Sequence, residues 1–247
     1  MDGWIEPAHG IHAEAASVLR RPAAHHAEHP GSTVALRRQR DTAAESGGEI
    51  REVLGEAAWR RLSPAIRRRF SEAALAEGAV HYIGVMADVR CSRLGWLLAQ
   101  ACRLLGTPLA PGNGTDVPVT VSVYRDPRRG GVTWERIYRF PGRRPVKVSS
   151  TKCRDAAGRF LEVAAGGIGM WLSVYERAGR LCFRSGDYFV ELAGRRLPLP
   201  QWLGPGETLV VHGDEPASRF RFTMTIRHRL FGETFFQDGV FETIEES

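Results

Sequence analysis

Apolar and polar residues alternate along a stretch near the C-terminus of the chain. From residue 220 to residue 227, every second residue is Phe, Met or Ile, and the residues between are Arg or Thr. Successive side chains of a strand point to opposite faces, so this pattern predicts a strand with one apolar face. A short turn at His228–Gly232 separates it from a second predicted strand, Thr234–Glu242. The two strands are predicted to form a β-hairpin around a hydrophobic interior.

Short strands separated by turn residues are predicted from Val80 almost to the C-terminus. Gly, Pro and Asp interrupt the apolar stretches, as at Gly186–Asp187. Short connections favour antiparallel pairing in a sheet that is closed or strongly curled, because few edges then stay exposed. The segment Leu197–Leu203 contains two prolines that cannot donate to a central ladder, and it is predicted to be an extended loop or a lid on the barrel mouth. The other predicted strands are Val80–Arg90, Val117–Arg125, Val132–Phe140, Val146–Cys153, Phe160–Ala165, Gly169–Glu176, Leu181–Ser185, Tyr188–Leu192 and Thr208–Gly213.

Three helices are predicted ahead of the main run of strands. The segment Glu49–Trp59 has amphipathic spacing, and Ser63–Pro64 begins a second helix with Ser as N-cap and Pro in the first turn. Ser92 caps the third helix, Arg93–Leu105, which ends at Gly106 and has an apolar stripe predicted to pack across the sheet. The predicted fold class is α+β. It consists of a strongly curved antiparallel β-sheet or barrel of about ten strands, with an N-terminal helix pair and one amphipathic helix packed on it.

Residues 1–48 differ in composition from the rest of the chain. They are rich in Ala, His, Arg and Glu, lack aromatic residues after Trp4 and end in Ser46–Gly48. Five of the eight histidines lie here, which would also be typical of a metal-binding tract, but the composition favours a solvated tail. The prediction is a poorly ordered extension at 1–48 and a single α+β domain at 49–247, with no metal site.

The net charge of +6 gives little support to a nucleic-acid partner. All but two of the 34 basic residues are Arg, a usage typical of GC-rich bacterial genomes, and they are scattered along the chain. The four cysteines form no Cys-x-x-Cys pair, so free thiols in a reducing cytoplasm are expected. No apolar stretch is long enough for a transmembrane helix, and the first residues do not form a secretory signal.

The sequence contains no motif that fixes a chemistry. A Gly-rich nucleotide loop, a nucleophile elbow and metal-ligand spacing are all missing, so no cofactor is expected. Glu233 and Gln237 are four residues apart and are predicted to share one strand face with Phe235, while Asp238 points away. If that face turns inward, a carboxylate and an amide lie among aromatic rings in an apolar cavity. The alternative is that Glu233 only pairs with an Arg across the hairpin.

Two sets of candidate site residues follow from this hypothesis. His212 is included among the catalytic candidates because it lies two residues from Asp214, although the pair could equally be a solvated rim. The predicted catalytic candidates are Glu233, His212 and Asp238. The predicted ligand-binding residues are Phe222, Met224, Phe235, Gln237, Trp202, Glu135 and Arg136.

Several stretches of the β-rich part resemble one known family. They are Leu105–Leu109, Asp116–Val121, Trp134–Arg136, Arg139–Gly142, Gly167–Met170, Leu197–Pro200, Val211–His212 and Gly232–Phe241. The chain resembles the bacterial domain of unknown function 4166 (DUF4166) from about Val53 to Phe241. The family has no assigned activity, and some members are similar to C-terminal partners of saccharopine-dehydrogenase-like or other Rossmann oxidoreductases. This chain carries no Gly-x-Gly-x-x-Gly motif after a strand, so any such oxidoreductase is expected to be a separate polypeptide.

Three functions remain open from the sequence. The preferred hypothesis is a non-enzymatic module that binds an apolar or lipid-like small molecule, because curved sheets with internal aromatic residues enclose cavities. The second is an enzyme that uses the Glu, Gln and His cluster. The third is an interaction module for a separate oxidoreductase.

Overall fold

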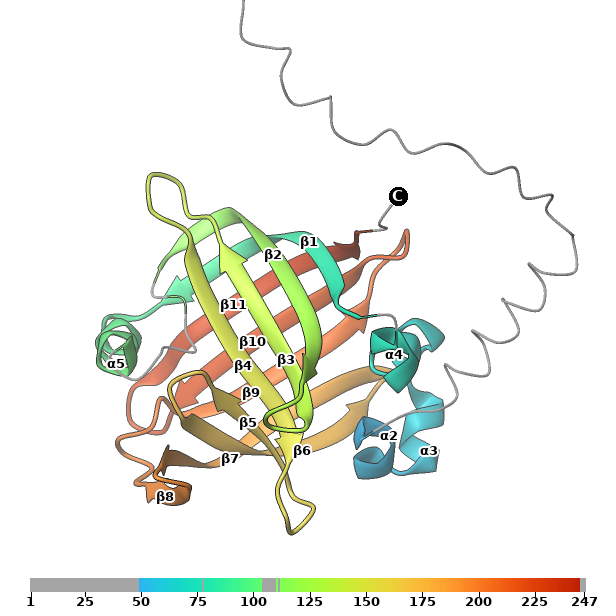
Figure 1. Cartoon of the computed structure of the whole chain (residues 1–247). Coiled ribbons are helices and arrows are strands. Elements are labelled where there is room, and N and C mark those ends of the chain that lie inside the picture. Colours follow the sequence, from blue (N-terminus) through green and yellow to red (C-terminus); the bar gives the residue numbers. More distant parts are fainter. Residues whose placement is uncertain (1–48, 77, 104–109, 111, 245–247) are drawn as a thin grey trace, which may run out of the picture. The chain divides into compact units, whose positions relative to one another are not determined.

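The protein is a closed β-barrel with short helices at its two ends (Figure 1). The computed structural model describes residues 49–76, 78–103, 110 and 112–244. The predicted extension at 1–48 and the predicted helix end at Gly106 lie outside the described residues.

The barrel is built entirely from antiparallel strand pairs. Its strands follow the order β6-β5-β4-β3-β2-β1-β11-β10-β9-β7, and β7 pairs back with β6 to close a ten-stranded ring, while β8 adds to β7 outside it. This architecture confirms the predicted fold class. The strands are β1 (Val80–Cys91), β2 (Gly114–Asp126), β3 (Gly131–Tyr138), β4 (Val146–Arg154), β5 (Phe160–Ala164), β6 (Ile168–Arg177), β7 (Arg180–Leu192), β8 (Arg195–Leu199), β9 (Glu207–Asp214), β10 (Phe220–His228) and β11 (Gly232–Thr243).

The structure corrects two details of the predicted strands. The two strands expected on either side of Gly186–Asp187 form one strand, β7, in which this dipeptide bulges opposite Trp171. The segment Leu197–Leu203 is predicted to be an extended loop or a lid. Its first three residues belong instead to β8, where Pro198 lies opposite Phe189. Proline is compatible with this position because β8 is an edge strand, and an edge strand needs only half of its backbone donors.

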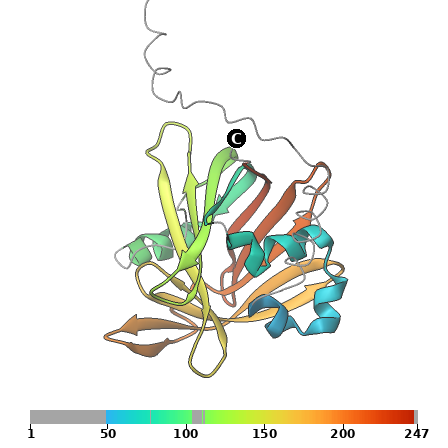
Figure 2. The same cartoon turned by 45° about the vertical axis from the view of Figure 1, so that its right-hand side comes forward.

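Short helices cover one end of the barrel (Figures 1 and 2). They are α2 (Glu49–Leu54), α3 (Glu56–Arg61), α4 (Pro64–Arg69) and the 3-10 helix η1 (Glu72–Leu75). The single helix predicted at 49–59 is divided at Gly55, whose φ of 74° is a conformation that glycine adopts without strain. The predicted cap at Ser63 is confirmed, since its hydroxyl accepts the Ile66 backbone N–H at 3.1 Å.

Helix α5 (Arg93–Arg103) lies apart from these helices and contacts β1 and β11. The predicted Ser92 cap is confirmed by a 3.0 Å bond from the Gly95 N–H to its hydroxyl. The predicted packing of this helix on the sheet is confirmed, but only part of its apolar stripe is covered, because Leu97 is 58% exposed. Gly95 explains the close approach on the other side of the helix, since a Cβ there would lie 2.1 Å from the Thr234 carbonyl oxygen.

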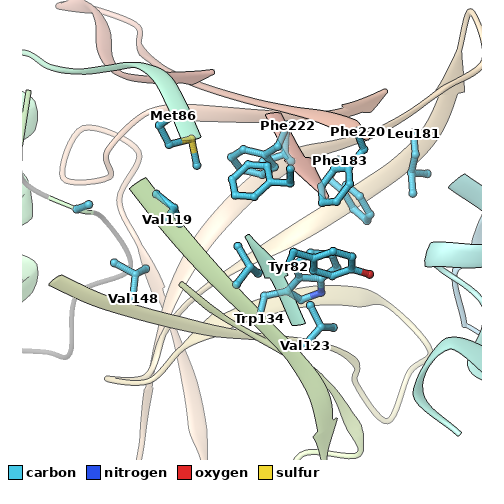
Figure 3. Packing of buried hydrophobic residues seen from close by; sticks show 14 of the residues in the cluster. Tyr82, Met86, Val119, Val123, Trp134, Val148, Leu181, Phe183, Phe220 and Phe222 are labelled. Atoms are coloured by element: carbon cyan, nitrogen blue, oxygen red, sulfur yellow. The ribbon is translucent and has the colours of Figure 1, made fainter. Parts of the chain in front are cut away.

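Inward side chains from facing strands fill the middle of the barrel, and Figure 3 shows aromatic and aliphatic members of this core directed toward one another. The predicted apolar face of the final hairpin is confirmed, because Phe220, Phe222 and Ile226 are all buried. Close packing of this kind removes apolar surface from water and is the main source of stability in such a domain.

Candidate functional site

Charged side chains lie inside the barrel where an apolar filling would be expected. Val148, Ser150 and Lys152 alternate along β4 and are all buried. Lys152 lies opposite Glu162 of β5, and Ser150 lies opposite Trp134 of β3. Two adjacent strands, β4 and β5, therefore direct an ammonium, a carboxylate and a hydroxyl into the same interior layer, beside Trp134 of β3.

Lys152 and Glu162 form a buried ion pair in this layer. The Lys152 Nζ is 3.1 Å from Glu162 Oε2, and the residues are only 6% and 9% exposed. The Ser150 hydroxyl donates to Glu162 Oε1 at 2.5 Å, so both carboxylate oxygens have a partner. Burial raises the pKa of Glu162, but the charges of Lys152 and Arg136 outweigh it and hold this pKa below its usual value. Burial lowers the pKa of Lys152, and Glu162 opposes that shift.

Arg136 of β3 adds a second positive charge to the interior. Its guanidinium carbon lies 5.6 Å from the centroid of the Phe222 ring and 5.9 Å from that of Trp134. Among the residues that the structure describes, none gives this guanidinium a hydrogen bond or an ion pair within bonding distance. Arg136 is only partly buried although it faces inward, because it borders an internal cavity.

The cavity adjoining Arg136 occupies the α5 end of the barrel and has a volume of about 100 Å³. This exceeds several times the roughly 10–15 Å³ that one water molecule requires. Its inner wall includes Tyr138, Val148, Ser150, Lys152, Glu162 and Val210, all of them buried. Its rim is mostly apolar and partly exposed, and includes Leu98, Ile168, Met170, Leu199, Leu203 and Pro205. A polar interior and an apolar rim are thus joined in one cavity.

A second cavity, of about 110 Å³, lies at the helix end and is bordered by Phe70 of the loop after α4 and by Leu75 of η1. Lys152 borders both cavities, so its side chain lies between them, while Glu162 borders only the cavity at the α5 end. Arg69 also borders the second cavity, where its guanidinium lies 3.9 Å from the Phe220 ring centroid and 3.6 Å from an Asp214 oxygen. The cavity at the α5 end, unlike the second one, is bordered by a partly buried arginine, Arg136, that has no ion-pair partner among the described residues.

The model of the family named domain of unknown function (DUF4166) matches residues 62–241. The chain belongs to the DUF4166 family. That match extends from α4 through nearly all of β11, and so includes the barrel strands, the cavity at the α5 end and most of the residues that border the second cavity. An uncharacterized protein of Bacillus subtilis (strain 168), YndH, is 26% identical over 139 residues, which are 53% of this chain and 67% of that protein. No solved structure matches the chain.

The structure places two predicted ligand-binding residues of this DUF4166 member, Arg136 and Met224, on the cavity wall. Phe222 and Phe235 are buried in the core, and Gln237 is 0% exposed. The Gln237 Oε1 accepts a 3.0 Å hydrogen bond from the hydroxyl of Tyr138, which is itself a wall residue. These three residues therefore support the wall from behind and do not border the open space.

The other two predicted ligand-binding residues lie away from the cavity. Glu135 alternates with Arg136, points outward and pairs with Lys147 at 3.1 Å. Trp202 is 69% exposed, next to the rim residue Leu203. The inference that Trp134 and Arg136 share one face, with Glu135 on the other, is confirmed.

The predicted polar cluster around Glu233 does not form. The pairing of β10 with β11 shifts between Ile226 and Arg227, so Thr234 has no residue opposite it and forms a bulge. A bulge reverses the alternation, and Glu233 therefore pairs with the exposed Arg90 at 3.3 Å while Gln237 points inward. The prediction that Glu233 and Gln237 share one face is wrong.

The remaining catalytic candidates are also separated. Asp238 lies on the outer face and pairs with Arg221 at 2.8 Å. His212 is buried among the rings of Phe70, Trp134 and Phe222, so the interpretation as part of a solvated rim is wrong for this residue. Burial, reinforced by nearby positive charges, holds the pKa of His212 well below its usual value. His212 is therefore neutral and enclosed near neutral pH, and its Nδ1 has no hydrogen-bond partner among the described residues.

The sequence predictions missed Ser150, Lys152 and Glu162. Glu162 lies in the strand Phe160–Ala164, whose five residues are all buried. The sequence offered two signals. One is a single acidic residue within a short apolar strand, and the other is a lysine in a chain whose basic residues are almost all Arg. Neither signal indicates a site by itself. The two residues become informative once the pairing of β4 with β5 places Lys152 opposite Glu162.

Two kinds of feature are absent from the residues that the structure describes: a helix that could span a membrane and a cluster that could hold a metal ion. No helix among them is long and apolar enough to cross a membrane. Within the same residues, no three His, Cys, Asp or Glu side chains lie close enough together to hold a metal ion.

Proposed function

We propose that this barrel binds an apolar or lipid-like small molecule in the cavity at its α5 end. The observation that carries the proposal is the cavity itself, which has a volume of about 100 Å³ and joins an apolar rim to a polar interior. Ligand sites in proteins are typically concave, mostly apolar and equipped with a few polar groups that fix orientation. The predicted role of Met224 and Arg136 in binding is kept within this proposal.

The composition of the rim supports an apolar ligand. Leu98, Met170 and Leu199 come from three separate elements and are partly exposed at the rim. Their remaining exposed apolar surface would be removed from water by a ligand, at roughly 25 cal/mol per Å² of surface buried. A ligand bound there would thus gain affinity without rearrangement of the barrel core.

The enzyme hypothesis has less support from the geometry. Its three candidate residues do not converge, because His212 is enclosed in the core while Glu233 and Asp238 form ion pairs on the outer face. The interaction hypothesis draws support from exposed apolar side chains such as Trp96, Leu97 and Phe231. A separate oxidoreductase partner therefore remains an alternative, and the experiment below distinguishes it.

The test uses a neutral fluorescent probe, N-phenyl-1-naphthylamine, whose emission rises in apolar surroundings. We expect the wild-type protein to bind it, with part of the probe in the cavity and the rest against the apolar rim, and Met224→Trp to lose binding, because the larger ring fills the cavity. Thr223→Trp is the matched control, since Thr223 is the neighbouring residue on β10 and does not border the cavity. Native mass spectrometry of the purified protein would show in parallel whether a small molecule remains bound.

The cavity-binding hypothesis and the interaction hypothesis predict different results for the two tryptophan variants. If Met224→Trp and Thr223→Trp bind the probe equally well, the probe occupies the exposed apolar surface and the cavity proposal fails. The interaction hypothesis would then be preferred. If only Met224→Trp loses the probe while its melting temperature stays close to that of wild type, binding in the cavity is supported.

A further inference from the structure

The charges within the barrel are unequal in number. Arg136 and Lys152 contribute two positive charges near the cavity, and Glu162 contributes one negative charge. The carboxylate oxygens of Glu162 are already bonded by Lys152 at 3.1 Å and by Ser150 at 2.5 Å. One positive charge, on the Arg136 guanidinium, is therefore left without a counter-ion among the described residues.

An unpaired guanidinium beside an internal cavity is costly unless something compensates it. Taking a charge out of water has a large unfavourable free energy, so charged groups inside proteins are normally paired. The Trp134 and Phe222 rings near Arg136 offer only cation–π contacts, at 5.9 and 5.6 Å. Within the part of the chain that the structure describes, the five N–H donors of the guanidinium have no acceptor, and the cavity is where one could enter.

We infer that the ligand of the cavity is an amphiphile with a single carboxylate, which the Arg136 guanidinium binds while the apolar part extends toward the rim at Leu98, Leu199 and Leu203. This inference rests on the proposed function, because it assigns a chemical class to the molecule proposed above. It would make Arg136 the residue that sets both the orientation and the charge preference of binding.

A carboxylate fits this site better than the other charged groups. The planar fork of arginine matches a carboxylate with two parallel hydrogen bonds. A group with two negative charges, such as a phosphate monoester, would bring more negative charge than the single unpaired positive charge balances. An ammonium group would be repelled by Arg136 and Lys152, and both oxygens of the one carboxylate it could use, Glu162, are already bonded.

The shape of the cavity gives the ligand its direction. The polar groups lie on the buried inner wall, and the apolar side chains lie on the partly exposed rim. A volume of about 100 Å³ accommodates the acidic group and a short part of a chain. The rest of the chain would then contact Leu199 and Leu203 and reach the outside between them.

The test compares three probes of equal chain length by isothermal titration calorimetry at pH 7.5: octanoate, octan-1-ol and octylammonium. We expect octanoate to bind the wild-type protein about tenfold to hundredfold more tightly than octan-1-ol, as for a charge-assisted hydrogen-bonded pair. Octylammonium should bind more weakly than octan-1-ol. Arg136→Gln should abolish the preference for octanoate and leave the affinity for octan-1-ol within a few-fold.

The matched control is Arg184→Gln, the same substitution at an outward-facing residue of β7 that pairs with Glu207. It should keep the octanoate preference of wild type, which shows that the effect is local and not one of net charge. Arg136→Lys keeps the charge without the fork and should restore part of the preference. This conservative variant keeps the test decisive if Arg136→Gln folds poorly.

The outcomes separate the inference from the proposed function. Equal affinity of wild-type protein for octanoate and octan-1-ol would overturn the carboxylate inference while supporting an apolar cavity. Tightest binding of octylammonium would also overturn it and would identify Glu162 as the binding group. If none of the three probes binds, the proposed function fails and the inference fails with it.

Discussion

Breaking the Lys152–Glu162 ion pair from its two sides should have unequal effects on stability. Glu162→Gln removes the carboxylate and leaves the buried Lys152 ammonium with Arg136 as its charged neighbour. Lys152→Met removes the ammonium, but Glu162 keeps the Ser150 hydroxyl at 2.5 Å and the charge of Arg136. The structure therefore offers a substitute partner for Glu162 and none for Lys152 among the described residues.

The expected magnitudes follow from this asymmetry. Removing one partner of a buried pair costs about 3–5 kcal/mol when the other charge is left uncompensated, and this is the expectation for Glu162→Gln. Lys152→Met should cost about 1–3 kcal/mol, the value of a lost hydrogen bond to a charged group. The double variant should be more stable than Glu162→Gln alone, because the uncompensated ammonium is then gone. The coupling free energy between the two positions should reach about 1 kcal/mol or more.

The assay is equilibrium unfolding in urea, followed by the fluorescence of buried tryptophans such as Trp59 and Trp134. Free energies of unfolding for the wild type, both single variants and the double variant complete one mutant cycle. If Glu162→Gln costs no more than Lys152→Met, or if the double variant is the least stable of the four, Lys152 does not depend on Glu162. The inference that Lys152 depends on Glu162 more than Glu162 depends on Lys152 would then be wrong.

Three further predictions concern residues outside this pair. His212 takes up a proton below about pH 6.5 in the unfolded chain, whereas the folded protein resists this protonation. The free energy of unfolding should therefore fall by about 1.4 kcal/mol per pH unit below that value. Urea titrations at pH 7.5 and 5.5 should show a smaller loss in His212→Leu than in the wild type. Gly239→Ala should cost about 1–3 kcal/mol in urea unfolding, because its Cβ would lie 2.6 Å from the Met86 sulfur and 2.9 Å from the Val85 carbonyl oxygen on the neighbouring strand. An unchanged midpoint would show that β1 and β11 can separate locally. Ser63→Ala should cost about 1 kcal/mol, because it removes both the 3.1 Å bond from the Ile66 N–H and the bond that the hydroxyl donates to Asp214. A melting temperature equal to that of wild type would contradict the role of this cap.

The barrel could be predicted from sequence wherever one face of a strand is apolar and the other is polar. Phe220, Phe222 and Ile226 are buried while Arg221 and Arg227 between and after them are exposed, so β10 shows the period of two directly. The helix cap at Ser63 was equally readable, because capping depends on residues adjacent in sequence. Local physical chemistry therefore carried most of the fold.

The interior ion pair could not be predicted in the same way, because its strands are buried on both faces. Leu161 and Val163 of β5 point outward, yet they are buried in a small second cluster with Phe189 of β7 and Cys153 of β4. Polar alternation is then lost, and the direction of Glu162 cannot be read from its neighbours. The bulge at Thr234 had a similar effect, since one extra residue reversed the predicted direction of Glu233.

The composition of the barrel interior is not what stability alone would favour. Replacing a buried ion pair with apolar residues of similar size is often neutral or stabilising by about 1–4 kcal/mol, and a cavity lowers stability in proportion to its volume. This barrel has both features side by side, with the unpaired Arg136 bordering the same cavity. A charged group kept beside an open space favours a binding role over a packing role, since active and binding sites commonly reduce stability in this way. On this reasoning Arg136→Met should raise the free energy of unfolding in urea while removing the octanoate preference in calorimetry. A variant that loses stability as well would instead show that Arg136 supports the Trp134 and Phe222 rings and serves the fold.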